Sequence, residues 1–386
     1  MTMDAISRRS CLKALAALVG ALAIPSIQAK DNATAVVIQA ETKELDQIAS
    51  LVQQFLTQFR VPSLSIAIAR QGEFVYRNAF GLIDKENHRD ASTESLYRIA
   101  SISKPITSVA VFSLIEQGKI NLHDHVFGPD GVLGNDYGTN LPDWVRIITV
   151  YHLLTHTAGG WSNNKNDPMF QRSGHLNQQE FIAWILASPD QKLQNEPGTN
   201  YAYSNFGYCI LGRIIEKVSG LTYSDYVKQN VLAKCGISDM RIAGDKLADR
   251  SPSEAVYYDD SGHSPYNMDF RRMDSHGGWL ASPTDLVEFA MRVTGLKAGE
   301  QILKEETVKT MMTPSTVNAG YACGWCVNNR PNWWHDGSLP GTSSILVRTA
   351  SGLCWSAISN ARNEGISPAL DQLIWKIVRY VPAWQS

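Results

Sequence analysis

Apolar positions near the start of the chain follow first a helical and then a strand spacing. The helical spacing predicts an amphipathic helix over residues 41–59, and its defining apolar positions are Leu45, Ile48, Val52, Phe55 and Phe59. Apolar residues then alternate over 64–68, and a second strand-like run covers 73–80 after a turn at 70–72. Two such runs joined by a short turn predict a β-hairpin.

The far end of the chain carries a matching set of elements. Strand-like runs cover residues 343–349 and 353–359 on either side of a turn. Ser367 and Pro368 are expected to cap a final helix. The apolar positions of that helix are Leu370, Leu373, Ile374, Ile377 and Val378.

Helical signals dominate the middle of the chain. Asn177 with Glu180 forms a capping pair before a helix, while Gly220 and Gly236 are expected to end helices over 208–218 and 223–235. We therefore predict an α+β fold with an antiparallel sheet formed from the N- and C-terminal strands and flanked by helices. A mainly helical domain is inserted in the chain between the two sets of strands, over residues 120–275 approximately. The last part of this insertion, 239–275, is rich in loops. The whole domain is expected to cover 30–385.

The first 29 residues have the pattern of an export signal. Arg8 and Arg9 precede an apolar run over 14–23, and the small residue Ala29 closes the segment. The paired arginines are typical of the twin-arginine type. A first helix of the domain is the alternative, but it explains neither the paired arginines nor the unbroken apolar run. We therefore expect an exported protein, periplasmic or secreted, with no stable membrane span once the signal is removed.

Composition narrows the range of partners. The chain is 44% apolar and 19% charged, with a formal net charge of −2, so it lacks the basic surplus that neutralises nucleic-acid phosphates. We expect a small-molecule substrate, no nucleic acid and no cofactor. The pairs Cys323 with Cys326 and His152 with His156 have metal-ligand spacing, but no further ligand completes a site. Packed strand residues and surface or loop histidines explain them better.

The strongest chemical signal is a serine and a lysine three residues apart. Ser101 and Lys104 share one face if they begin a helix, and Pro105 is tolerated in a first turn. A lysine held beside a serine can accept its proton or act as the cation that tunes another base. Taken alone, the tetrapeptide fits better an N-cap serine followed by a surface lysine.

Three motifs that follow one another along the chain favour a catalytic role for that tetrapeptide. The segment 98–107 resembles the nucleophile segment of the class C β-lactamase and penicillin-binding-protein superfamily of serine hydrolases. Tyr203-Ser204-Asn205 resembles the Y-x-N motif of that superfamily, and residues 334–341 lie where its K-T-G strand is expected. Segments 149–160 and 277–289 are also similar, so the resemblance spans roughly 41–380.

The resemblance implies a role for each matching residue. Ser101 would attack the substrate carbonyl and become acylated, while Lys104 would hydrogen-bond Ser101 and keep the local field positive. Tyr203 would act as the base and return the proton to the leaving group. Asn205 would contact the substrate or Lys104. The backbone N–H groups of Ser101 and Ser338 would form the oxyanion hole.

The third motif departs from the superfamily pattern. His335, Asp336 and Gly337 stand in place of Lys-Thr-Gly, and we expect His335 and Gly337 to lie at the substrate. A mostly neutral histidine beside an aspartate should hold a substrate carboxylate less well. This strand resembles that of the superfamily's esterases and peptidase-like members, so we predict hydrolysis of small neutral carboxylic esters through an acyl-enzyme.

Several alternatives stay open at this point. One is a D-amino-acid peptidase, a D-Ala-D-Ala carboxypeptidase or a weak class C-type β-lactamase, and another is a non-catalytic penicillin-binding sensor. A cation from elsewhere in the chain could replace the missing lysine, the candidates being Arg271, Arg272 and Arg348. Some aromatic residues near the motifs could line an apolar pocket or simply pack in the core, namely Trp161, Tyr201, Trp279, Trp333 and Trp334.

Overall fold

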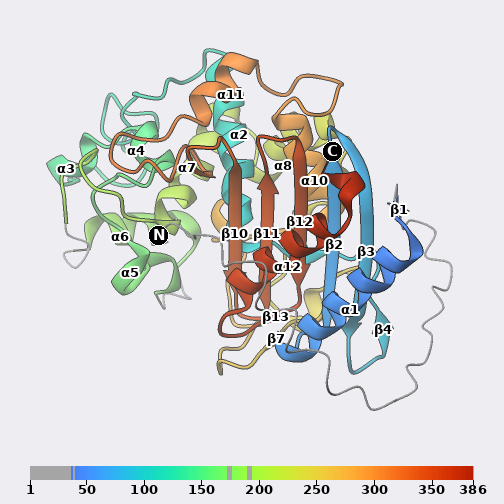
Figure 1. The fold of residues 1–386 in the computed structure, drawn as a ribbon. Helices are drawn as coiled ribbons and strands as arrows, with labels where there is room; N and C mark the ends of the chain where they lie inside the picture. Colours follow the sequence, from blue (N-terminus) through green and yellow to red (C-terminus); the bar gives the residue numbers. More distant parts are fainter. Residues whose placement is uncertain (1–35, 38–39, 172–175, 189–193, 386) are drawn as a thin grey trace. The chain divides into compact units, whose positions relative to one another are not determined.

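Segments from both ends of the chain meet in one antiparallel sheet (Figure 1). The computed structural model describes residues 36–37, 40–171, 176–188 and 194–385, which belong to one compact unit. Strand β2 (Ser63–Arg70) pairs with β3 (Glu73–Asp84) on one side and with β12 (Leu353–Ser359) on the other. The predicted hairpin and the predicted junction of the two ends are therefore confirmed.

The strand order in this sheet is β1-β3-β2-β12-β11-β10-β9, with β4 paired to β3. The remaining strands of the sheet are β1 (Val36–Val37), β4 (Arg89–Asp90), β9 (Cys326–Val327), β10 (Trp333–Leu339) and β11 (Thr342–Arg348). A second sheet has the order β5-β8-β6, formed by β5 (Tyr97–Arg98), β8 (Trp279–Ala281) and β6 (Arg241–Ile242). The short strands β7 (Tyr258–Asp259) and β13 (Ala361–Arg362) pair with each other.

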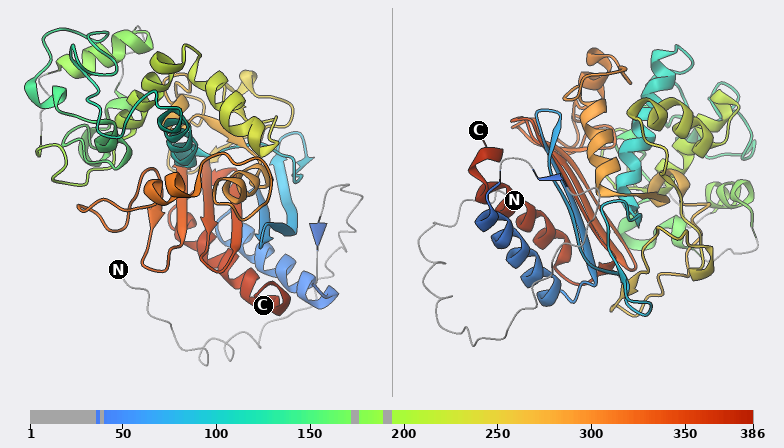
Figure 2. Two further views of the ribbon diagram at one scale, coloured as in Figure 1. Left: turned by 90° about the horizontal axis from the view of Figure 1, so that it is seen from above. Right: turned by 90° about the vertical axis from the view of Figure 1, so that its right-hand side faces the viewer.

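Two helices cover one face of the main sheet. Helix α1 (Thr42–Gln58) and helix α12 (Ile366–Tyr380) lie side by side on it (Figure 2). Alternate residues of a strand point to opposite faces, so Ile66 and Ile68 pack toward these helices and Ala67 toward the other side. Small residues on that other side let helices approach the sheet closely.

The opposite face carries the helical part of the chain. Helix α2 (Ser103–Glu116) is buried nearly all round, from Ser103 to Leu114, as expected for a central helix. The longer helices of this part are α6 (Gln178–Ala187), α7 (Asn205–Ser219), α10 (Pro283–Val293) and α11 (Glu305–Met311). Helices α7 and α11 contact α2, whereas α10 packs on strands β2 and β12. The shorter ones are α3 (Asp143–Arg146), α4 (Val150–Leu154), α5 (Asn163–Asn166), α8 (Tyr223–Val227) and α9 (Asp274–Gly277).

Short turns of other helix types connect these elements. The 3₁₀ turns are η1 (Ala100–Ile102), η2 (Pro168–Phe170), η4 (Ala233–Cys235), η5 (Leu247–Asp249) and η6 (Pro382–Trp384), and η3 (Lys228–Leu232) is a π turn. The helix predicted over 223–235 is thus α8, η3 and η4 in succession, ended by left-handed Gly236 as expected. Within the described part of the chain, no helix has the length and apolar character needed to cross a bilayer.

The predicted α+β fold class is confirmed, with differences at two helix ends. The predicted cap at Ser367 and Pro368 is wrong, because α12 begins at Ile366 after Gly365 in a left-handed conformation, which places Pro368 inside the first turn. Helix α7 begins at Asn205, earlier than predicted, with the Ser204 side chain capping it. The boundaries 120–275 of the inserted region stay a prediction. The export signal lies outside the described residues.

Candidate active site

Ser101 lies on a tight turn between the short sheet and the central helix. Strand β5 ends at Arg98, and η1 then leads directly into α2. The preceding residue, Ala100, has a φ of 49°, a left-handed conformation that is costly for a residue with a side chain. Strained backbone at this point holds the Ser101 side chain, half-buried, at the wall of a cavity.

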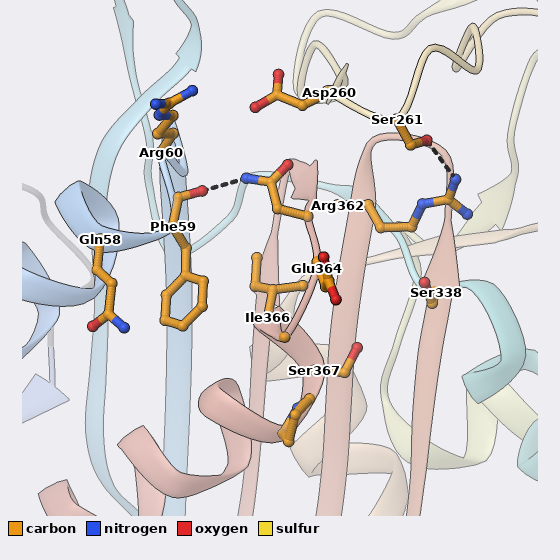
Figure 3. Close-up of a pocket in the computed structure, with 13 residues that line it drawn as sticks. Gln58, Phe59, Arg60, Asp260, Ser261, Ser338, Arg362, Glu364, Ile366 and Ser367 are labelled. Carbon is orange, nitrogen blue, oxygen red and sulfur yellow. Dashed lines mark hydrogen bonds between the residues drawn. The ribbon is translucent and has the colours of Figure 1, made fainter.

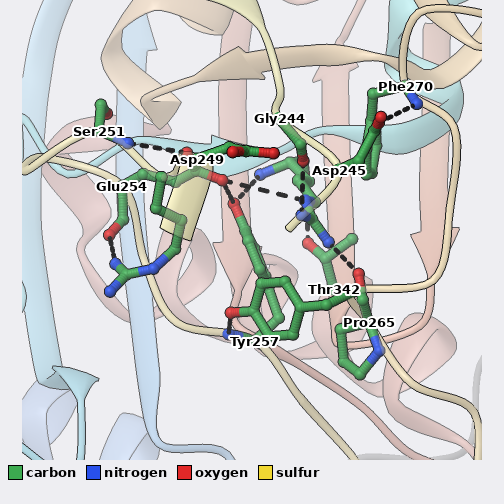
Figure 4. A network of polar contacts seen from close by, with 12 residues as sticks. Gly244, Asp245, Asp249, Ser251, Glu254, Tyr257, Pro265, Phe270 and Thr342 are labelled. Carbon is green, nitrogen blue, oxygen red and sulfur yellow. Dashed lines mark hydrogen bonds and ion pairs between the residues drawn. The ribbon is translucent and has the colours of Figure 1, made fainter. Parts of the chain in front are cut away.

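A buried network fixes the segment that carries the serine (Figure 4). The Arg98 side chain has no exposed surface; it lies over the Tyr257 ring at 4.2 Å and donates to the Gly244 carbonyl at 3.1 Å. Its Nε is 3.9 Å from Glu254 Oε1. The backbone carbonyl of Arg98 accepts from Thr342 on β11 at 2.7 Å. The residues before Ser101 are therefore anchored both to the loop over 244–265 and to the main sheet.

Lys104 lies fully buried beside Ser101, as its helical spacing predicted. Its Nζ is 3.1 Å from Ser101 Oγ, 2.8 Å from Asn205 Oδ1 and 2.9 Å from the backbone oxygen of His276. Burial lowers the pKa of the ammonium from its ordinary value of 10.5 to about 7, and the carboxylates of Asp167 and Asp336 oppose this shift. A substantial share of Lys104 side chains is therefore uncharged at neutral pH.

Tyr203 approaches the serine from the loop before α7. Its hydroxyl hydrogen-bonds Ser101, and its ring lies 4.3 Å from the His156 ring and 4.7 Å from Lys104 Nζ. Burial raises the pKa of this phenol well above its ordinary value of 10, although the hydrogen bond to Ser101 opposes the shift. Tyr203 is thus a neutral phenol at physiological pH.

A carboxylate that the sequence did not reveal supports the lysine through an amide. Asn205, the first residue of α7, accepts from Lys104 through Oδ1 and donates through Nδ2 to Asp167 Oδ2 at 2.6 Å. Asp167 also accepts from the backbone N–H of Met169 at 3.0 Å. Burial raises the pKa of this carboxyl group. An isolated aspartate in a loop carries no motif, so sequence reasoning had no signal for it.

Strand β10 brings the third motif against the nucleophile turn. A Cβ added to Gly337 would lie 2.2 Å from the backbone oxygen of Ile99, so only glycine allows η1 to pack on the strand here. Leu339 and Thr342 flank the two-residue hairpin turn and form its hydrogen-bonded pair. Hydrogen-bonded and non-hydrogen-bonded pairs alternate along an antiparallel ladder, so the next pair, Ser338 with Ser343, is a non-hydrogen-bonded one. The Ser338 N–H therefore points away from β11, toward the side of β10 where no strand pairs with it. This direction is compatible with the predicted role of the Ser338 N–H as an oxyanion-hole donor.

Two buried side chains and a backbone carbonyl fix His335 in one neutral tautomer. The Ser204 N–H donates to His156 Nδ1 at 3.1 Å, so the proton of neutral His156 is on Nε2, which donates to Tyr321 Oη at 3.1 Å. Tyr321 in turn donates to His335 Nε2 at 3.2 Å, and His335 Nδ1–H donates to the Asp336 carbonyl at 2.6 Å. Burial lowers the pKa of His335 to about 4. The side chain in the lysine position of the motif is therefore uncharged.

These groups line one cavity of about 760 Å³. Its wall includes Ser101, Tyr203, His335, Asp336 and Ser338, so all three motifs reach the same space; Lys104 lies directly beneath Ser101. Further wall residues are Asn163, Asp167, Phe170, Tyr201, Asn205, His276 and Tyr321. Gly337 does not line the cavity, but its lack of a side chain lets the turn that carries Ser101 pack against β10. The predicted site residues are thus brought together in space, whereas their roles stay predictions.

A second cavity of about 920 Å³ adjoins the first (Figure 3). Ser338 and Arg362 line both cavities, and the second lies between the end of α1 and the start of α12. Arg362 is the arginine that reaches the site, but its Nε is 3.1 Å from Asp259 Oδ2. It was not among the predicted cations, since its short strand gave no signal in the sequence.

Most of the other residues considered for the cavity lie elsewhere. Arg272 pairs with Asp269 and lies over the Phe181 ring, and Arg348 lies over the Trp333 ring at the far end of β10. Of the aromatic residues considered, Tyr201 lines the cavity. Those that pack in the core or against it are Trp161, Trp279, Trp333 and Trp334.

Comparisons with known proteins agree with this arrangement. The sequence model of the Beta-lactamase family matches residues 48–379. Penicillin-binding protein 4* of Bacillus subtilis (strain 168) is 25% identical over 313 residues, which are 74% of this chain and 64% of the relative. The chain thus spans just under two-thirds of that relative's length.

Solved structures show the same fold at lower identity. The D-amino acid amidase of Ochrobactrum anthropi SV3, complexed with D-phenylalanine, is similar with a TM-score of 0.72 and 20% identity, covering 89% of this chain and 99% of that one. EstCE1, described as a hydrolase with promiscuous acyltransferase activity, has a TM-score of 0.69 at 21% identity, covering 87% of this chain and 98% of that one.

Proposed function

Because the chain belongs to the Beta-lactamase family, as its three motifs predicted, we propose that it is a serine hydrolase that cleaves small carboxylic esters through an acyl-enzyme on Ser101. One observation carries this proposal: the Ser101 hydroxyl lies at the cavity wall within 3.1 Å of a fully buried lysine. A serine hydroxyl becomes a useful nucleophile only when a neighbouring group takes its proton. Lys104 is placed to do so.

The hydrogen-bond partners of Lys104 support Lys104 as the base of the first proton transfer, in place of Tyr203, the base that the resemblance implied. The Asn205 Oδ1 and the His276 carbonyl can only accept hydrogen bonds, so they engage both N–H groups of an uncharged lysine. The lone pair of that amine then faces Ser101 Oγ. In this proposal the amine takes the serine proton as Oγ attacks the ester carbonyl, and the bond to the leaving oxygen breaks. Tyr203, a neutral phenol at Ser101, donates its proton to that oxygen and recovers one from Lys104.

Negative charge develops on the carbonyl oxygen as the serine attacks. The backbone N–H groups of Ser101 and Ser338 would stabilise it, and one such donor typically contributes about 3 to 4 kcal/mol. Water then repeats the same steps on the acyl-enzyme and releases the acid. At pH 7 this cycle begins from the uncharged fraction of Lys104 and from the neutral phenol of Tyr203.

The charge on the cavity wall favours neutral esters over β-lactams as substrates. Penicillins and D-Ala-D-Ala peptides present a carboxylate, but His335 is neutral and Asp336 is an exposed carboxylate on the same wall. Arg362 also lines this cavity, and Asp259 already neutralises its charge. Substrates without a carboxylate should therefore be preferred.

A parallel assay of purified protein tests the proposal. A short-chain nitrophenyl ester, a chromogenic cephalosporin and a D-Ala-D-Ala peptide would be compared, with the Ser101→Ala variant as control. We expect kcat/KM for the ester to exceed that for the other two by about a hundredfold, the effect of about 3 kcal/mol of differential binding. Higher activity on the cephalosporin or the peptide would instead favour the β-lactamase or carboxypeptidase alternative. Absence of all three activities would favour a penicillin-binding sensor.

Export is a separate part of the proposal. It is supported by Arg8, Arg9 and the apolar run that follows them in the sequence. Fractionation of cells that express the full chain should find the protein outside the cytoplasm, shortened near residue 29. Replacing Arg8 and Arg9 together by lysine should retain it inside.

A further inference from the structure

Asp336 contributes an exposed carboxylate to the wall of the cavity that Ser101 also lines. Within the described part of the chain, no hydrogen bond or ion pair engages its carboxylate oxygens; its backbone oxygen, by contrast, accepts from His335. The negative charge of Asp336 also raises the pKa of Lys104 and that of Tyr203.

The other charged side chains of the wall are already compensated. Arg362 is paired with Asp259 and donates to Ser261 Oγ at 3.0 Å. Asp167 accepts from Asn205 and from a backbone N–H, and so contributes to the support of Lys104. Among the described residues of the wall, Asp336 therefore carries a charge that no neighbouring side chain neutralises. An incoming substrate would meet this charge at the mouth of the cavity.

The position of Asp336 along β10 fixes where it would contact a substrate. It lies two residues before Ser338, whose N–H is the predicted oxyanion-hole donor on this strand. Two residues of extended strand span about 7 Å. A group that contacts the Asp336 carboxylate therefore lies a few covalent bonds from the carbonyl carbon that Ser101 attacks.

We propose that Asp336 is a specificity-determining residue that binds an ammonium group of the substrate, so that the preferred substrates are esters of amino acids or of short amino-substituted acids. This inference rests on the proposed function and narrows its substrate class. The ammonium would donate hydrogen bonds to the free carboxylate, and such charge-assisted bonds are stronger than neutral ones. An anionic substrate would meet the same charge with repulsion.

The test compares three nitrophenyl esters of equal chain length that end in an ammonium, a methyl or a carboxylate group. Each is assayed with the natural enzyme and with Asp336→Asn, which keeps the shape of the side chain and removes its charge. Taking the ratio of the two enzymes for one ester cancels that ester's intrinsic reactivity. Glu364→Gln, which removes a carboxylate from the adjoining cavity, is the matched control.

We expect Asp336→Asn to lower kcat/KM for the ammonium ester about tenfold or more, the usual effect of losing a hydrogen bond to a charged group. The methyl ester should change less than threefold and the carboxylate ester should gain. Added salt should weaken the ammonium preference of the natural enzyme only. Equal effects on all three esters, or the same pattern in Glu364→Gln, would overturn the inference while leaving the ester hydrolase intact. Failure of every ester with the natural enzyme would instead refute the proposed function.

Discussion

The pH dependence of acylation distinguishes Lys104 from Tyr203 as the base. With a pKa of about 7, about a tenth of Lys104 side chains are uncharged at pH 6 and about nine-tenths at pH 8. If the uncharged amine takes the serine proton, kcat/KM should rise about tenfold over this interval and then level off. If Lys104 were needed as a cation, kcat/KM would fall over the same interval.

The Asp167→Asn variant makes the test specific to this lysine. The Asp167 carboxylate favours the charged form of Lys104, so its removal should lower the lysine pKa and move the rise in kcat/KM to lower pH. The buried histidines of the site do not interfere, because burial already lowers the pKa of His156, His276 and His335 below 6.5.

The assay is initial-rate hydrolysis of a nitrophenyl ester from pH 5 to pH 9, with product absorbance corrected for its own ionisation. His263 is exposed and lines the cavity, so His263→Gln serves as the control and should leave the profile unchanged. A profile that falls through pH 7 would refute the role of Lys104 as the base. A shift to higher pH in Asp167→Asn would refute the electrostatic reasoning.

Three further substitutions test the supporting structure. Gly337→Ala should force η1 away from β10 and lower kcat by about 10²- to 10³-fold, the value of one oxyanion donor, whereas Gly320→Ala in an open loop should have little effect. Tyr321→Phe should leave two buried histidine nitrogens without their partner and lower the free energy of unfolding by about 1–3 kcal/mol in denaturant titration. Arg98→Met should lower it by about 3–5 kcal/mol, because the buried Glu254 carboxylate keeps its hydrogen bond from Tyr257 but loses the Arg98 cation. Adding Glu254→Gln should restore part of that loss, and an additive double variant would contradict the pairing.

Local patterns in the sequence were sufficient for the frame of the fold. The alternation over β2, β3, β11 and β12 and the helical spacing of α1 depend on neighbouring residues, so each could be predicted from a short window. The start of α12 could not, because a left-handed glycine that begins a helix is uncommon and Ser367-Pro368 has the more usual pattern.

The residues of the site also fall into two groups, those that could be predicted from the sequence and those that could not. Ser101 and Lys104 are three residues apart, so their contact followed from helix geometry, and the resemblance supplied Tyr203 and Asn205. The groups that the sequence did not reveal, Asp167, Tyr321 and Arg362 among them, are single residues on loops or short strands. Tertiary packing alone brings them to the cavity, so no pattern of neighbouring residues in the sequence predicts them.

Identification of the acylated residue tests the central claim most directly. Purified protein would be treated with a serine-reactive phosphonate or quenched during turnover of an ester, then digested and analysed by mass spectrometry. The account predicts one added group on the peptide that contains Ser101, at unit stoichiometry and with loss of activity, and no such addition in Ser101→Ala. Labelling of another residue, or full activity in Ser101→Ala, would contradict it.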